Sequence, residues 1–101
     1  MINAIYKVKD DKYISLEVSG HALANEYGKD LICASVSSIM FGLMNALDEL
    51  NEDVEIVQLT NEIKIMNNSD SDIIQDYLEL TIIQLKTIEE SYGDFIKVER
   101  K

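Results

Sequence analysis

The sequence predicts an α+β fold in which a mixed, mostly antiparallel sheet carries two helices on one of its faces. Four short stretches alternate apolar and polar residues, as half-buried strands do, and two longer stretches repeat apolar residues with the period of a helix. The predicted order is therefore ββαββαβ, in two layers, with residues 1–101 forming a single domain. A chain this short buries only about two thirds of its unfolded surface, so we expect one modest core.

A β-hairpin is predicted at the beginning of the chain. Apolar and polar residues alternate over residues 2–8 and again over residues 13–19. Asp10 and Asp11 lie between these two segments, where short polar residues favour a turn.

The next segment, residues 20–30, is predicted to be a mobile loop because it holds two glycines, Gly20 and Gly28, and no sustained period. A helix is expected from about Leu31, with Asp30 as a candidate N-cap. Its apolar stripe consists of Ile32, Val36, Ile39, Met40, Leu43, Leu47 and Leu50.

Two strands followed by a helix are also predicted in the second half of the chain. The expected elements are strands at residues 54–59 and 62–66, a helix at about 72–92 and a last strand at 95–99. Thr60 and Asn61 are placed to form a tight turn between the first two strands, and Gly93 is placed to end the helix.

The composition restricts the function classes. A net charge of -10, from 19 acidic and 9 basic residues, argues against direct binding of nucleic acid, which requires clustered Lys and Arg. Neither a membrane span nor a signal peptide is predicted, so a cytoplasmic protein is expected. The only cysteine cannot form an intramolecular disulfide or a multi-thiolate zinc site, and we expect no metal or other cofactor.

Cys33 and His21, the only cysteine and the only histidine, are about twelve positions apart. A thiol and an imidazole are the two groups that a cysteine nucleophile needs. Taken by themselves, Cys33 could equally be a small buried apolar residue, and His21 an ordinary loop histidine.

The residues around this pair form a longer pattern. It consists of Gly20-His21-Ala22, the run Gly28-Lys29-Asp30-Leu31-Ile32-Cys33-Ala34-Ser35-Val36-Ser37, and a later Asn45-Ala46-Leu47. This pattern resembles the signature of the ribosomal-processing cysteine proteases called Prp. The resemblance implies a cysteine endopeptidase with a Cys33–His21 pair. It also implies the substrate, a precursor of the large-ribosomal-subunit protein L-twenty-seven, whose N-terminal extension is removed.

On this interpretation, Cys33 attacks the scissile carbonyl, and His21 holds the thiolate and then protonates the leaving amine. Backbone N–H groups of Cys33 and Ala34, in the first turn of the helix, would meet the oxyanion. Asp30 has two possible roles, as helix cap or as the carboxylate that orients His21. Ser37 matches the family serine, and it is also placed like an ordinary surface serine of a helix.

The loop and the second helix suggest how partners bind. Gly20 and Gly28 bracket the segment that carries His21, which therefore resembles a lid, and Leu23 and Tyr27 could contact an apolar side chain of a peptide. Exposure of Phe41 and a wide apolar arc on the second helix favour a homodimer, as the resemblance also does. The arc consists of Ile73, Ile74, Tyr77, Leu78, Leu80, Ile82, Leu85 and Ile88.

Two other functions remain open from the sequence. The first is a non-enzymatic module that binds a ribosomal partner with the same loop, and the second is a thiol redox sensor.

Overall fold

A computed structural model describes the backbone of residues 1–20 and 27–101 and the side chains of residues 1–20 and 31–101. The elements are β1 (Ile2–Lys9), β2 (Lys12–Ser19), α1 (Tyr27–Leu50), β3 (Val54–Leu59), β4 (Glu62–Asn67), α2 (Asp72–Tyr92) and β5 (Ile96–Arg100). The predicted order ββαββαβ is confirmed, and the strands differ from the expected ranges by only one or two residues at their ends.

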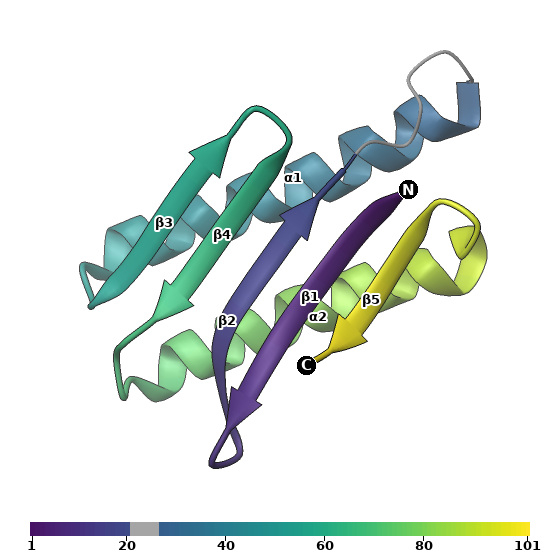
Figure 1. The fold of residues 1–101 in the computed structure, drawn as a ribbon. Coiled ribbons are helices and arrows are strands. Elements are labelled where there is room, and N and C mark those ends of the chain that lie inside the picture. Colours follow the sequence, from purple (N-terminus) through teal and green to yellow (C-terminus); the bar gives the residue numbers. More distant parts are fainter. Residues whose placement is uncertain (21–26) are drawn as a thin grey trace.

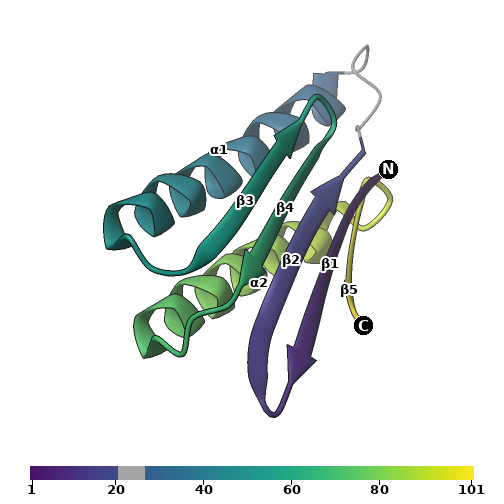
Figure 2. The same ribbon diagram turned by 60° about the vertical axis from the view of Figure 1, so that its left-hand side comes forward.

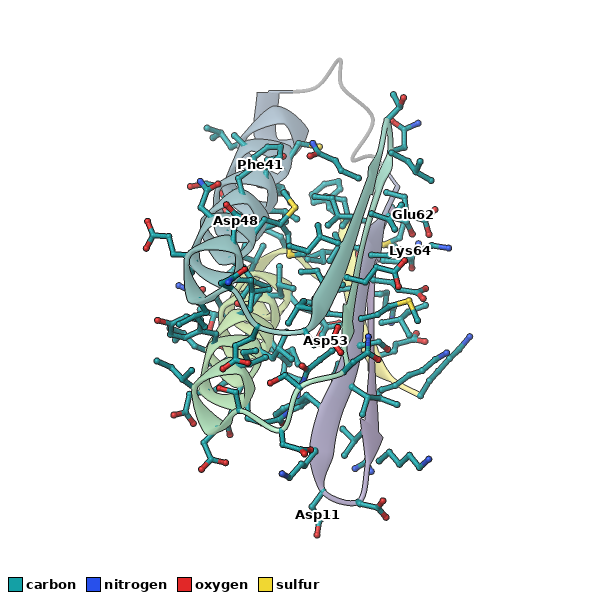
Figure 3. All side chains as sticks on the ribbon, turned by 90° about the vertical axis from the view of Figure 1, so that its left-hand side faces the viewer. Asp11, Phe41, Asp48, Asp53, Glu62 and Lys64 are labelled. Atoms are coloured by element: carbon teal, nitrogen blue, oxygen red, sulfur yellow. The ribbon has the colours of Figure 1, made fainter. Side chains whose placement is uncertain are left out.

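The strands form one five-stranded sheet in the order β3-β4-β2-β1-β5. All neighbours are antiparallel except β1 and β5, which run parallel, so the sheet is mixed and mostly antiparallel, as predicted. Both helices lie on the same side of this sheet, which gives the two predicted layers (Figures 1 and 3). No helix covers the other side of the sheet, and Glu62 and Lys64 are among its side chains (Figure 3).

The core lies between the helices and the sheet. Alternate residues of the central strands point toward the helices, and every third or fourth residue of each helix meets them. The buried apolar side chains are Ile2, Ala4, Tyr6, Leu16, Val18, Ile32, Val36, Met40, Leu43, Leu47, Ile65, Ile74, Leu78, Ile82, Leu85 and Ile96.

The sequence also predicts a helix start that the structure corrects. α1 begins at Tyr27, so residues 27–30 belong to the helix and not to the loop expected over residues 20–30. Asp30 is the fourth residue of α1 and is therefore not its N-cap. The segment contains no proline, and Gly28 costs a helix only about 1 kcal/mol relative to alanine, so nothing there prevents the extra turn.

The second helix has the predicted bounds, from Asp72 to Tyr92. Side chains of the preceding loop hold the chain before the helix, because the Asn67 Oδ1 accepts from the Ser69 N–H and the Ser69 Oγ accepts from the Ser71 N–H. Gly93 follows the last helical residue as predicted, although its backbone stays in the right-handed helical region.

The β1–β2 hairpin is held to α2 by side chains. Gln75 of α2 accepts a hydrogen bond from the Tyr13 N–H at 2.7 Å and donates one to the Tyr13 carbonyl at 2.8 Å. The tip itself is formed by Asp10 and Asp11, both with positive φ. This tip lies at the opposite end of the sheet from the tip of the β3–β4 hairpin (Figure 1).

One helix within the described residues, the part of α1 from Leu31 to Leu50, is long and apolar enough to cross a membrane by length and composition. Its residues at helical spacing, including Ile32, Val36, Met40 and Leu47, are buried in the core. A core helix passes the same length and composition test, and the buried stripe of α1 accounts for part of its apolar character.

Candidate active site

A cavity of about 140 Å³ opens at one end of the molecule, between α1 and the tip of the β3–β4 hairpin. This end also holds the beginning of α1, the end of β2 and the N-terminus (Figures 1 and 2). The cavity is lined by Ile2, Val18, Ser19, Gly20, Cys33, Val36, Ser37, Met40, Phe41, Gln58, Leu59, Thr60, Asn61, Glu62 and Ile63.

The α1 wall places Cys33 beside apolar side chains. Cys33, Val36, Ser37, Met40 and Phe41 follow one another at helical spacing, so they share one face of α1. Cys33 is half-buried and packs against the core, which agrees with its predicted position at the margin of the apolar stripe. Cys33 therefore packs against apolar side chains on one side and borders the cavity on the other.

The facing wall consists of six consecutive residues, from Gln58 to Ile63, at the tip of the β3–β4 hairpin. Gln58 pairs with Ile63 across the hairpin. Since side chains alternate along a strand, Gln58 lies on the same, helix-facing side of β3 as Ile56, which packs against the core. Gln58 is therefore a polar residue at a position where the strand pattern favours an apolar one.

Gly20 forms the third side of the cavity and is held in place by the backbone. Its N–H donates to the Asn61 carbonyl at 3.0 Å, and its φ is +94°. A Cβ on Gly20 would overlap the carbonyl oxygen of Met1. Only glycine fits this conformation and this close approach without strain. The chain thus continues from a fixed point of the cavity wall toward His21.

Three of the predicted site residues line this one cavity: Cys33, Ser37 and Gly20. Ser37 is exposed, and so is Ala34. Two predicted site residues, His21 and Leu23, lie outside the described residues. The remaining three, Tyr27, Gly28 and Asp30, lie in the first turn of α1, where the backbone alone is described.

The early start of α1 overturns the predicted oxyanion site. Only the first four N–H groups of a helix lack an intrahelical acceptor, and in α1 these belong to residues 27–30. Cys33 and Ala34 are the seventh and eighth residues of α1, and their N–H groups face the carbonyls four residues earlier. The helix macrodipole acts most strongly in the first turn, and Cys33 lies beyond that turn.

The sequence predicts neither the hairpin wall nor the position of Phe41 in the cavity, since it indicates Phe41 only as part of a dimer surface. Phe41 is 44% exposed, as predicted, and it also lines the cavity together with Cys33. One signal in the sequence could have indicated that this hairpin borders a cavity, since Gln58 is polar where the alternation of Val54 and Ile56 favours an apolar residue. Among the residues that the structure describes, no group of three His, Cys, Asp or Glu side chains could hold a metal ion.

The fold and the cavity define a small α+β protein that presents a half-buried cysteine to a small cavity, as a protein with a cysteine nucleophile requires. The family model for cysteine protease Prp matches residues 1–97. A ribosomal processing cysteine protease Prp of Bacillus subtilis (strain 168) is 32% identical over 107 residues, covering 97% of this chain and 96% of the relative.

Two solved structures of a ribosomal processing protease Prp from S. aureus share the fold. The complex with a covalently linked product peptide has a TM-score of 0.90 at 32% identity, and the complex with a substrate peptide has a TM-score of 0.89 at 31% identity. Each match covers 100% of both chains. The chain belongs to the cysteine protease Prp family, which confirms the resemblance seen in the sequence, and it is a cysteine protease.

Proposed function

We propose that this protease removes the N-terminal extension from the precursor of the large-ribosomal-subunit protein L-twenty-seven, with Cys33 as nucleophile and His21 as its acid–base partner. The observation that carries the proposal is the shared cavity. Cys33 lines it from α1, and Gly20, the residue directly before His21, lines it from the end of β2. The likeness to proteins named for ribosomal processing supports the substrate class. We propose the cytoplasm as the place of action.

The chemistry requires two steps. The Cys33 thiolate attacks the scissile carbonyl carbon, and the C–N bond breaks as His21 gives its proton to the leaving amine, which leaves a thioester on Cys33. Water then attacks the thioester carbonyl while His21 accepts a proton, and the thiol is released with the carboxylate product. The covalently linked product peptide of the S. aureus protein is consistent with such an enzyme-bound intermediate.

Cleavage of a precursor peptide tests the proposal. We expect mass spectrometry to detect one cut in a peptide that carries the apolar N-terminal extension, and no cut with Cys33→Ala. The substitution removes one half-buried sulfur, so the variant should remain folded. Cleavage by folded Cys33→Ala protein would disprove the nucleophile.

The role of His21 needs a separate measurement. His21→Ala should lower the cleavage rate by a factor of about 100 or more, the usual size of a general acid–base contribution. It should also raise the pH at which Cys33 is alkylated by iodoacetamide, because an imidazolium neighbour stabilises the thiolate. An unchanged alkylation profile would exclude His21 from that role.

We also propose a homodimer. The wide arc of α2 is only partly covered, since Ile73 and Leu80 are 43% and 55% exposed. A groove between α1 and α2 is lined by Ile39, Leu43, Ala46, Tyr77 and Leu80 among others. Contiguous exposed apolar surface of this kind favours self-association. Light scattering should give a dimer mass for the parent protein and a lower mass for Leu80→Asp. A monomeric parent protein at micromolar concentration would contradict the proposal.

A further inference from the structure

We infer that Gln58 binds the backbone of the substrate peptide, opposite Cys33. The inference rests on the proposed peptide cleavage, and its occupant is the extended peptide whose scissile bond must approach Cys33. Gln58 and Cys33 line the same cavity from opposite sides, one from β3 and the other from α1. A peptide next to the thiol therefore passes within the region that Gln58 borders.

The position of Gln58 on the strand is the main observation. Its side of β3 faces the helices, and the earlier residues on that side, Val54 and Ile56, pack against the core. Gln58 is exposed because the cavity opens there. The floor of the cavity, which lies toward the core, is apolar and consists of the buried side chains of Val18, Val36 and Met40. A few polar groups at the border of a mainly apolar cavity usually fix the orientation of the ligand.

The chemistry of the amide indicates which part of the substrate it binds. A glutamine side chain has a carbonyl acceptor and an NH2 donor, so it complements the N–H and C=O groups that every peptide presents. The apolar floor of the cavity can then accept the neighbouring side chain. A cavity of about 140 Å³ is comparable with the roughly 150 Å³ apolar cavity that holds one benzene molecule. Gln58 would hold the backbone while the floor selects one apolar side chain.

Replacement of Gln58 by methionine tests this inference, because methionine has a similar length and no hydrogen-bonding amide. Loss of one or two hydrogen bonds should lower kcat/KM for the precursor peptide by a factor of about three to ten, mainly through a higher KM. Glu55→Met, on the opposite and exposed face of β3, is the control and should leave kcat/KM unchanged. An equal kcat/KM for Gln58→Met and the parent protein would overturn the inference.

Modified peptides identify the hydrogen bond. In a series of peptides, each carries one backbone amide replaced by an ester. One of these ester peptides should be cleaved equally well by Gln58→Met and by the parent protein, because with that peptide neither protein can form the hydrogen bond. An ester removes the N–H but keeps the carbonyl, so if every ester peptide keeps the full difference, the Gln58 Oε1 does not accept from a backbone N–H. Binding of labelled peptide to Cys33→Ala protein, with and without Gln58→Met, separates this result from a failure of the proposed function. Weaker binding in the double variant supports Gln58 even where the parent protein cuts no peptide, and equal binding refutes it.

Discussion

The two β-hairpins of this protein have the same connection and different roles. Both join antiparallel strands through two residues, Asp10–Asp11 in β1–β2 and Thr60–Asn61 in β3–β4. The first is in the middle of the sheet and is held to α2 by Gln75, whereas the second contains the edge strand β3 and borders the cavity that holds Cys33. The central hairpin therefore stabilises the fold, and we expect the peripheral hairpin to contribute to function.

A matched pair of leucines should show the largest difference between the hairpins. Leu16 of β2 is 0% exposed and Leu59 of β3 is 55% exposed. Leu16→Ala should lower the free energy of unfolding by about 2–5 kcal/mol, because it leaves a cavity in the core. Leu59→Ala should change it by less than about 0.5 kcal/mol, as exposed substitutions usually do.

Urea unfolding of both variants measures these changes, and peptide cleavage completes the comparison. Since Leu59 pairs with Glu62 and its side chain lies on the open side of the sheet, Leu59→Ala should leave both the fold and KM unchanged. Equal stability losses at the two positions would show that β3–β4 belongs to the core as much as β1–β2 does.

Two glycine substitutions test how tightly Gly20, which connects the end of β2 to the β3–β4 tip, is held. Gly20, at the end of β2, has φ +94° and no room for a Cβ, so Gly20→Ala should cost about 2 kcal/mol or more. Gly42 in α1 has nothing within 4 Å of an added Cβ, and Gly42→Ala should stabilise the protein by about 0.5–1 kcal/mol. Thermal unfolding distinguishes them. A flexible hinge at Gly20 would instead tolerate alanine with little loss of stability and a large loss of turnover.

Two glutamines should give opposite results on stability and activity. Gln75→Met removes both hydrogen bonds to the Tyr13 backbone, which should cost about 1–3 kcal/mol and leave kcat/KM unchanged. Gln58→Met should lower kcat/KM with little change in stability. Unfolding and cleavage assays on the same two preparations give all four values. Lower activity of folded Gln75→Met would indicate that the β1–β2 tip, although distant from the cavity, affects the active site.

The sequence was sufficient for elements with clear ends. The bounds of α2 follow from the polar loop before Asp72 and from Gly93, and the strands follow from alternation. The start of α1 does not follow from the sequence. Gly28 is typical of a loop, although a helix tolerates one glycine, and no proline marks where the loop ends. The motif predicted Cys33 and Ser37 as site residues, and both line the cavity. The wall from Gln58 to Ile63 was not predicted, because hairpin position relative to α1 depends on packing between residues far apart in the chain.

The smallest expected effect concerns the tip of the central hairpin. Asp11 has φ +63°, in the left-handed region where residues with a Cβ are disfavoured and glycine is not. Asp11→Gly should therefore stabilise the protein by about 0.5–1 kcal/mol, less than the full penalty because aspartate tolerates this region better than most residues. Urea unfolding measures the gain, and Asp11→Ala is the control because it removes the same charge but keeps the Cβ. If the two variants are equally stable, the gain comes from the lost carboxylate beside Asp10, and backbone strain at the tip is negligible. Cleavage should be unchanged in both, because this tip lies at the opposite end of the sheet from the β3–β4 tip that borders the cavity (Figure 1).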